Sequence, residues 1–316
     1  MKFRFFNELL YILNVSSAAT LTSVGTGNFQ FIKRIHFVLL LSPHLKRLYC
    51  WRNKDKHPLI AAEIVNNLLI YNSLYSTYIS KKWSLKDKMG VIESHYCATN
   101  EFARFLYVQQ NCYINLIQLD AAHGDVRIVV DSPHWMRVEG EVTLSLFYND
   151  IRLQWLTFSI GLVDENYVFI VGALQGWAGK LGDERESIKK INVELSKKLH
   201  QLHPRIFLFY CMKMIARSIH VHEIWGVSKE NHRTKVWHNF FSRNQLKSYN
   251  TFWEDHGGSI NHEGFYVISS DKSYKSIDDV PTKKRLLYKK KYQLLDAVEQ
   301  QLDRNIRENN YQTKNH

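Results

Sequence analysis

The middle of the chain carries three consecutive runs of β-branched and aromatic residues, separated by short polar turns. The runs are Glu141–Tyr148, Ile151–Ile160 and Tyr167–Leu174, and the turns are Asn149-Asp150 and Asp164-Glu165-Asn166. Short connections rich in Asn and Asp are typical of β-hairpins. Because links this short join only antiparallel neighbours, the region predicts an antiparallel meander, and the fold must be built around a sheet.

Strand and helix spacings alternate on either side of this meander. Further strands are predicted at Tyr113–Leu119, Val126–Val130, His222–Ser228 and Gly264–Ile268. Helices are predicted at Glu184–Leu202, which Pro204 would end, at Arg205–His220 and around Phe240. Up to about residue 110 the apolar residues recur at helical spacing, and Ser84 is a candidate N-cap for a further helix.

These patterns predict an α+β fold, in which an N-terminal helical region is followed by a mainly antiparallel sheet flanked by helices. We divide the chain into a helical region at 1–110, an α+β domain at 111–304 that ends in a basic helix, and a polar tail at 305–316 that should fray. Hydrophobic residues make up 45% of the 316 and aromatic residues 13%, enough for a packed core, which excludes an intrinsically disordered protein.

A strongly basic segment lies near the C-terminus. Six cations occur there with no acid among them: Lys283, Lys284, Arg285, Lys289, Lys290 and Lys291. Pro281 at the start, with Leu287, Leu294 and Leu295 at helical spacing, predicts an amphipathic helix that packs on the domain. The net charge of +12 favours a polyanionic partner, such as anionic lipid, a lipopolysaccharide precursor, nucleic acid or another polyanion. A basic helix that is merely solvated is the alternative.

No run of residues is long enough to predict a transmembrane segment. Met1–Phe6 begins like a signal peptide, but polar residues interrupt it, and Phe37–Leu41 is far shorter than the roughly 20 apolar residues that span a bilayer. The cysteines are scattered without a C-x-x-C pair, as is typical of a reducing compartment. We therefore expect a cytoplasmic protein that associates peripherally, if at all, with the inner membrane.

The junction between the last meander strand and the next helix is rich in glycine. Its residues Gln175, Gly176, Gly179, Lys180 and Gly182 bring backbone N–H groups close to a helix start, where anions are favoured. The placement resembles the pyrophosphate loop of GNAT-type acyltransferases, and this resemblance implies that the five residues contact acyl-CoA. The loop is longer than that family's motif, and acids follow it, so a structural glycine-rich turn is the alternative.

A candidate acid–base pair lies further along the chain. His232 follows the strand that ends at Ser228, at an edge where functional loops often lie, and it is the first choice for a general base. Glu254 is the candidate orienting carboxylate. In the alternative, His232 caps a helix and Trp253 packs in the core. His220 and His222, with Glu223 beside them, would share a face of a strand, but no third ligand follows at a diagnostic distance, so no metal site is predicted.

Across most of the chain, short motifs follow one another in a fixed order. They are His95-Tyr96, Glu139-Gly140-Glu141, Leu174-Gln175-Gly176, Gly226-Val227-Ser228 with Asn231-His232, Phe252-Trp253, Gly257-Gly258, and Pro281-x-Lys283-Lys284-Arg285 through Tyr292-x-Leu294-Leu295-Asp296. This series resembles the VirK/YbjX family, a group of Gram-negative bacterial proteins built around a domain of unknown function. The chain departs from the family's N-H-V-Y-R-like run at Asn231-His232-Arg233-Thr234-Lys235, where the tyrosine is missing.

The resemblance implies an accessory protein in virulence, envelope integrity or stress response, including resistance to cationic antimicrobial peptides. It brings no enzymatic activity with it. Our first hypothesis is such an accessory protein that binds an anionic partner through the basic helix. The alternatives are a GNAT-like acyltransferase that uses acyl-CoA or acyl carrier protein, and a nucleic-acid-binding stress protein.

Overall fold

The computed structural model describes residues 35–66, 69–110, 112–119, 123–177, 183–232 and 249–312. The helix expected around Phe240 lies outside these ranges. The described residues belong to two units: those up to Tyr78 with Trp83–Met89 form the first, and Ile79–Lys82 with those from Gly90 onward form the second. The domain boundary placed at residue 110 stays a prediction.

The first unit is helical, as the spacing of its apolar residues predicts. Its elements are η1 (Ser42–His44), α3 (Leu45–Trp51), α4 (Pro58–Asn66), α5 (Leu69–Tyr75) and the first residues of α6 (Leu85–Glu101). Ser84 caps α6 as expected, because its hydroxyl accepts from the Asp87 N–H at 3.3 Å while the Asp87 carboxylate accepts from the Ser84 N–H at 2.8 Å. None of the helices in the described ranges has the length and apolar composition needed to cross a membrane.

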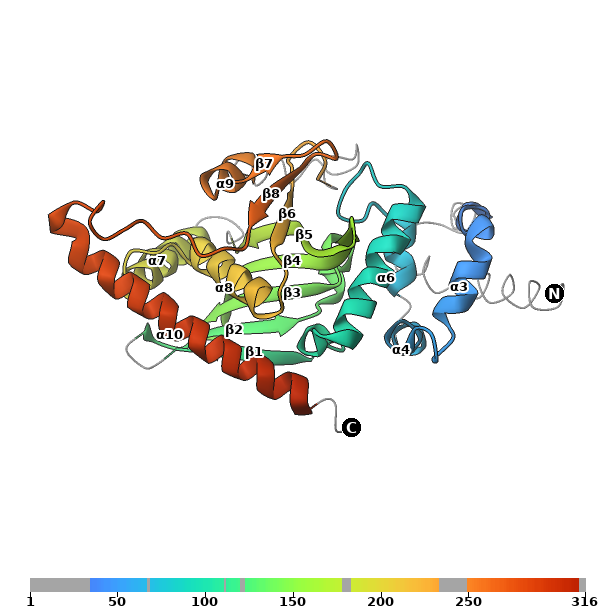
Figure 1. Ribbon diagram of the computed structural model, residues 1–316, viewed down its shortest axis with the longest axis horizontal. Helices are drawn as coiled ribbons and strands as arrows, with labels where there is room; N and C mark the ends of the chain where they lie inside the picture. Colours follow the sequence, from blue (N-terminus) through green and yellow to red (C-terminus); the bar gives the residue numbers. More distant parts are fainter. Residues whose placement is uncertain are drawn as a thin grey trace. The chain divides into compact units, whose positions relative to one another are not determined.

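The second unit is built on one eight-stranded sheet, with the strand order β1-β2-β3-β4-β5-β6-β8-β7 (Figure 1). The strands are β1 (Tyr113–Gln118), β2 (Val126–Asp131), β3 (Val142–Tyr148), β4 (Ile151–Val163), β5 (Asn166–Gly176), β6 (Glu223–Val227), β7 (Ser259–Ile260) and β8 (Phe265–Ser269). All neighbours pair antiparallel except β5 and β6, which are parallel. The predicted α+β class and the meander of β3, β4 and β5 are confirmed.

Two tight turns set the register of the meander. Asn149 and Asp150, between β3 and β4, have φ values of 48° and 62°, and Asp164 and Glu165, between β4 and β5, have values of 45° and 65°. Left-handed φ at both central residues is the hairpin geometry whose twist matches that of the flanking strands. Asn and Asp tolerate this conformation better than most residues, which is why the sequence marks these turns.

Helices α7 (Asp183–Lys198) and α8 (Pro204–Ser218) follow β5. The prediction that one helix runs to Leu202 and is ended by Pro204 is wrong. The chain leaves the helix near His200, whose φ is 53°, and Pro204 instead begins α8, where a missing N–H leaves no bond unmade. His203 caps α8 by accepting a hydrogen bond from the Arg205 N–H at 3.2 Å.

The C-terminal helix α10 (Thr282–Gln312) is longer than predicted. The sequence predicts a frayed tail from residue 305, because polar residues dominate there. Leu302 and Ile306 are nevertheless 0% and 2% exposed, so the packed stripe of the helix continues past Arg304. This correction concerns residues up to 312 only.

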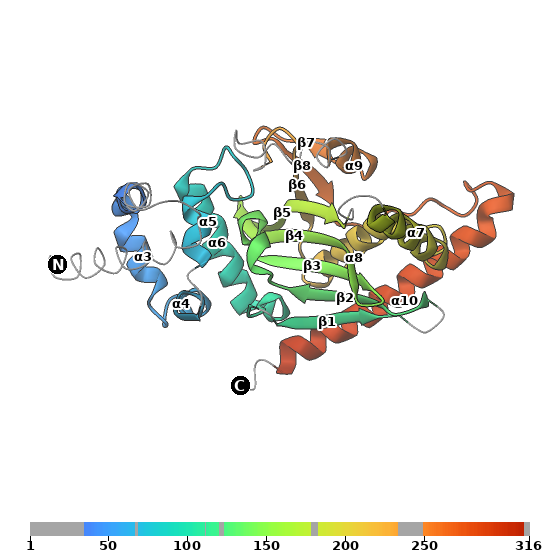
Figure 2. The same ribbon diagram turned by 180° about the vertical axis from the view of Figure 1, so that it is seen from behind.

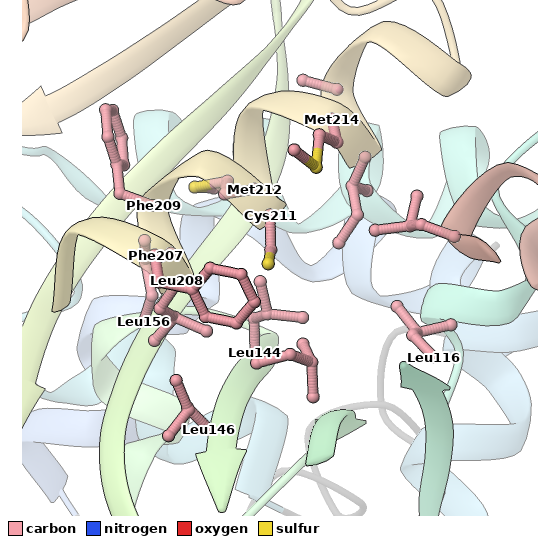
Figure 3. Packing of buried hydrophobic residues seen from close by; sticks show 14 of the residues in the cluster. Leu116, Leu144, Leu146, Leu156, Phe207, Leu208, Phe209, Cys211, Met212 and Met214 are labelled. Carbon is pink, nitrogen blue, oxygen red and sulfur yellow. The ribbon is translucent and has the colours of Figure 1, made fainter. Parts of the chain in front are cut away.

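The sheet face toward α8 is apolar. α8 lies against β3, β4 and β5, and α10 lies against α8 and β1 (Figure 1). Figure 3 shows side chains of α8, including Phe207 and Leu208, packed on Leu144, Leu146 and Leu156 of β3 and β4. Burying an aliphatic or aromatic side chain of this size contributes about 1.5–3 kcal/mol, so this layer is a main source of stability.

The opposite face of the sheet is polar, although much of it is buried. From behind, strands β1 to β4 lie in front of α8 and α10 (Figure 2). The short helix η4 (His134–Glu139) lies against β4 and β5. The buried polar side chains on or beside this face are Asp131, Thr143, Ser145, Thr157 and Ser159. Four of them hydrogen-bond in pairs, Ser145 to Asp131 at 3.0 Å and Thr143 with Thr157 at 3.1 Å. The Ser159 hydroxyl accepts from the Glu141 N–H at 3.0 Å, so these buried polar groups have partners.

A buried ion pair lies next to this polar face. Arg137 Nη2 is 3.3 Å from a Glu141 carboxylate oxygen, and their side chains are 7% and 0% exposed. The Tyr96 hydroxyl donates to Glu141 at 2.9 Å. The neighbouring His95 accepts the Ile160 N–H at its Nδ1 (3.2 Å), and burial, followed by the charge of Arg137, lowers the pKa of His95 to about 3. His95 is therefore neutral, and its role here is structural.

Candidate anion-binding surface

The N-terminal half of α10 is held firmly by the segment that precedes it. The Arg285 guanidinium donates to the carbonyls of Val280 and Asp278, at 3.0 Å each. Tyr292 stacks on Tyr274 with ring centroids 4.6 Å apart and planes 7° apart. Through these contacts, Arg285 and Tyr292 attach the first turns of α10 to the segment before it. The basic part of the helix therefore has a fixed position in the second unit.

Four lysines project from this fixed part of the helix. Lys283, Lys284, Lys289 and Lys290 are all exposed, and none makes an ion pair with a residue that the structure describes. Leu286 lies among them, one helical turn from Lys283 and Lys290, and it is 67% exposed. We call Lys283, Lys284, Leu286, Lys289 and Lys290 the α10 surface. It combines unpaired cations with an exposed apolar side chain.

The other two predicted polyanion-binding residues have contacts within the fold. Arg285 clamps the helix start, as described above. The Lys291 ammonium lies over the ring of Tyr288, 3.9 Å from its centroid. Burial, followed by the charge of Lys275, lowers the pKa of Lys291. The structure therefore separates the six cations into four that face outward and two that face the protein.

A groove of about 340 Å³ adjoins the α10 surface at Lys290. His123 and His200 also line it, with their rings edge to face and their centroids 6.0 Å apart. Partial burial, followed by the charges of His123 and Lys290, lowers the pKa of His200. No carboxylate lines the groove among the residues described there. The groove thus places an ammonium and two imidazoles around one hollow, an arrangement that favours an anion.

Strand β5 is longer than its parallel partner β6, and the pairing between them ends partway along β5. β6 pairs only with Val168–Val171, whereas β4 pairs with β5 as far as Gly176. Side chains replace β6 beyond this point: the Tyr249 hydroxyl accepts from the Leu174 N–H at 2.9 Å, and the Gln175 amide lies 3.3 Å from both carboxylate oxygens of Glu139.

Tyr249 is a residue that the sequence motifs do not include, and Glu139 belongs to a motif but was not predicted to contact Gln175. Both reach β5 from distant parts of the chain, so no spacing rule reveals these contacts. Of the five residues expected to bind a cofactor, Gln175 and Gly176 lie at this divergence of β5 from β6. Gly179, Lys180 and Gly182 lie outside the described residues, so their role stays a prediction.

The two candidate catalytic residues are placed differently from one another. His232 is 1% exposed, and its ring meets the Tyr249 ring edge to face at 5.3 Å. Glu254 is exposed and accepts a hydrogen bond from the Tyr266 hydroxyl at 2.8 Å. The carboxylate is thus engaged by Tyr266 and not by His232. Trp253 is fully buried, as the structural alternative for it predicts. A catalytic role for His232 or Glu254 stays a prediction.

The ordered motifs of the sequence largely pack against one another. Tyr96 and Glu141 hydrogen-bond across two motifs. A Cβ on Gly226 would lie 2.4 Å from the Trp253 ring, so glycine is required there for this indole to pack. The Gly258 N–H in turn donates to the Trp253 carbonyl at 2.8 Å. These motifs describe how the sheet and its surrounding helices interlock, which explains why they identify relatives better than they identify a ligand.

Comparison with known proteins gives the same family as these motifs. The family model described as "Protein of unknown function (DUF535)" matches residues 28–304. The uncharacterized protein YbjX of Escherichia coli (strain K12) is 24% identical over 263 residues, which cover 80% of this chain and 77% of YbjX. An uncharacterized protein of Haemophilus influenzae (strain ATCC 51907 / DSM 11121 / KW20 / Rd) is 23% identical over 229 residues, with 72% and 74% covered. No solved structure matches, so the expected likeness to GNAT-type acyltransferases has no support from a known fold. With most of its length matched, this chain belongs to the DUF535 family, and the resemblance to VirK/YbjX proteins is confirmed.

Proposed function

We propose that this chain is a peripheral protein that binds an anionic lipid surface through the α10 surface. The observation that carries the proposal is Leu286, which is 67% exposed among four outward lysines on a clamped helix. An apolar side chain in that setting enters the boundary between head groups and acyl chains, while the lysine stems extend to the phosphates. The scattered cysteines favour the cytoplasmic face of the inner membrane as that surface.

Lipid is a better partner for this surface than nucleic acid. Proteins that bind single strands stack bases on aromatic side chains. Tyr292, an aromatic residue of the basic segment, already stacks on Tyr274, and the Tyr288 ring is covered by Lys291. The exposed apolar residue among the lysines is Leu286, which offers a base no ring to stack on. Binding to nucleic acid would therefore rest on charge alone.

The groove beside Lys290 strengthens the proposal. A phosphate group there would be bound by Lys290 and by one or both imidazoles of His123 and His200. Such a group belongs to lipid head groups and to lipopolysaccharide precursors alike. Roles in virulence, envelope integrity or peptide resistance, which the family resemblance implies, would follow from binding at this surface.

The test is vesicle co-sedimentation of the full chain. Vesicles of phosphatidylcholine with phosphatidylglycerol should bind it, and vesicles of phosphatidylcholine alone should not. The variant Lys283→Gln/Lys284→Gln/Lys289→Gln/Lys290→Gln should bind on the order of 100- to 1000-fold more weakly, since each lysine near an anionic surface contributes about 1 kcal/mol. Leu286→Ser should weaken binding even at high salt, where charge is screened.

A matched control removes the same charge elsewhere. Lys81, Lys82, Lys190 and Lys197 are also exposed, and their joint change to glutamine lowers the net charge equally. This control should retain most of the binding. Equal losses in the two variants would mean that net charge, not the α10 surface, drives association. Undiminished binding by the α10 variant would remove the proposal, and tighter binding to single-stranded nucleic acid than to vesicles would favour the nucleic-acid alternative.

A second candidate function, acyl transfer from acyl-CoA or acyl carrier protein, is favoured by the divergence of β5 from β6. Beyond Val171, no strand that the structure describes pairs with this edge of β5, so its backbone groups are bound by side chains. The Leu174 N–H, for example, donates to the Tyr249 hydroxyl. The amide groups of a pantetheine arm would hydrogen-bond to backbone groups at such a strand edge. Calorimetry with a panel of acyl-CoAs tests it. Binding of any acyl-CoA would support the candidate, and no heat and no thermal shift with any of them would exclude it.

A further inference from the structure

A second hollow lies on the polar face of the sheet, opposite to α8. Its volume is about 350 Å³, and β1, β2, β3, β4 and the start of η4 line it. The cross-strand register places Arg127 of β2, Phe147 of β3 and Arg152 of β4 side by side across its floor. We call this hollow the sheet-face pocket. It contains no residue of the α10 surface or of the groove beside it.

The charges of the sheet-face pocket are balanced. Arg152 forms an ion pair with Asp131, and its guanidinium also donates to the Ser145 hydroxyl at 2.9 Å. Arg127 pairs with Asp150. The Asp131 side chain is 9% exposed, and burial raises its pKa although Arg152 opposes the shift. With two cations and two anions in its lining, the pocket offers no net attraction to an anion.

The paired groups keep hydrogen-bonding capacity. A guanidinium has five N–H donors and an ionised carboxylate about four acceptor positions, more than these ion pairs use. Both guanidinium groups lie over Phe147, with their central carbons 5.0 and 5.9 Å from the ring centroid, and this contact holds them in position. Fixed donors and acceptors therefore lie next to each other, which suits hydroxyl groups because each hydroxyl both donates and accepts.

Flat aromatic side chains form the rim. Trp135 is 61% exposed and Tyr113 is 63% exposed, and both line the pocket. Large aromatic residues exposed at a concave site are typical of binding sites. Their ring faces pack well on the apolar C–H faces of a ring-shaped ligand, while the polar floor remains available to its hydroxyls.

We propose that the sheet-face pocket binds a neutral saccharide. A sugar ring offers the two things that the pocket is built to contact, a C–H face for the aromatic rim and a set of hydroxyls for the charge-balanced floor. The volume, about 350 Å³, is at the low end of the range for small-molecule sites and fits one or two sugar rings. A phosphorylated or carboxylated sugar would meet Asp131 and Asp150, so added negative charge should not improve binding.

Cys112 makes the proposal directly testable, because this exposed thiol also lines the pocket. The experiment measures the rate of alkylation of Cys112 in the full chain by peptide mass spectrometry. The probes are glucose, galactose, mannose, N-acetylglucosamine and their disaccharides, with glucose 6-phosphate and glucuronate as charged counterparts. At least one neutral saccharide should slow the alkylation of Cys112 with a Kd on the order of 1 mM or below, a typical value for weak small-ligand binding.

The variants use the exposed rim, since replacing Arg152 would remove the ion-pair partner of the buried Asp131 and endanger folding. Trp135→Ala should raise the Kd of the protecting saccharide about tenfold or more, as expected for the loss of an aromatic anchor. Trp177→Ala is the matched control, because Trp177 is also exposed (43%) and does not line the pocket. It should leave the protection unchanged.

Three results would overturn the proposal. One is that no neutral saccharide slows the alkylation of Cys112. Another is that a charged counterpart protects much better than its neutral parent, which would contradict the charge-balance argument. The last is that Trp177→Ala weakens protection as much as Trp135→Ala.

Discussion

Two sets of cations in the second unit carry the same charge and have opposite surroundings. Around the polar face of the sheet, Arg137 and Arg152 are largely buried, and each is paired with a carboxylate. On the α10 surface, Lys283 and Lys290 are exposed and have no ion-pair partner among the described residues. A buried cation without a partner would destabilise the fold, whereas an exposed one hardly affects stability. The difference teaches that the charges of the arginines are used within the fold, while the charges of the α10 lysines remain available to an anionic ligand.

The largest effect should come from breaking a buried pair. Arg137→Met removes this ion-pair partner from the buried Glu141 carboxylate, which keeps the hydrogen bond from Tyr96. We expect the free energy of unfolding in denaturant titrations to fall by about 3–5 kcal/mol. Adding Glu141→Leu should recover much of that loss, because no unpaired charge then remains. A single variant as stable as the parent would contradict the assigned structural role.

The pH dependence of stability tests the buried groups in this comparison, through His95, which lies near Arg137. His95 is neutral in the fold because its pKa is lowered from 6.5 to about 3, so below 6.5 the unfolded chain binds a proton that the folded chain does not. Stability should therefore fall as the pH is lowered from about 6.5 to about 3, by up to about 1.4 kcal/mol per pH unit. His95→Gln should flatten that part of the profile, as measured by thermal unfolding across pH. An unchanged slope would show that other groups cause it.

A smaller loss of stability is expected within α10, where Arg285 bonds to the fold and the neighbouring Lys284 is exposed. Arg285→Gln removes hydrogen bonds to the Val280 and Asp278 carbonyls and should cost about 1–2 kcal/mol. The neighbouring Lys284→Gln removes the same charge from an exposed, unpaired position and serves as the control. Calorimetric unfolding should separate the two variants. Equal stability would mean that Arg285 does not clamp the helix.

The smallest effect on stability is expected for the four-lysine variant of the α10 surface. Surface changes of this kind usually alter the free energy of unfolding by about 0.5 kcal/mol or less per site, and removing like charges favours the folded state slightly. Its thermal midpoint should therefore match or slightly exceed that of the parent while its vesicle binding collapses. A marked loss of stability would place these lysines with the structural cations.

Local sequence rules predict the parts of the fold that local contacts determine. The meander, its Asn149-Asp150 turn and the Ser84 cap depend on residues a few positions apart, and all three are confirmed. The two helices α7 and α8 were predicted, but the end of α7 was placed four residues too late, because Pro204 suits both the end of one helix and the start of the next. The length of α10 was missed because a single buried residue per turn, such as Ile306, sustains a helix that is otherwise polar.

The candidate sites show the same limit more strongly. The α10 lysines are recognisable from sequence because charge and helical spacing are local. The sheet-face pocket is not, because Asp131 and Arg152 meet only when β2, β3 and β4 are in register. Tyr249 and Leu174 lie still further apart in the chain. Sequence spacing also could not show that Glu254 bonds to Tyr266, since β8 and the helix before it, α9 (Tyr249–Asp255), come together only in the fold.

The stack of Tyr274 on Tyr292 and the Arg285 clamp have a consequence for geometry on a membrane. A basic tail on a flexible linker tethers a protein without directing it, because the linker allows every tilt. α10 is fixed at its start, and one face of it packs on the second unit through Leu294, Leu295 and Val298. A lipid surface that takes up the α10 lysines would therefore set the angle of every strand in the sheet. Recruitment and orientation would then be one event.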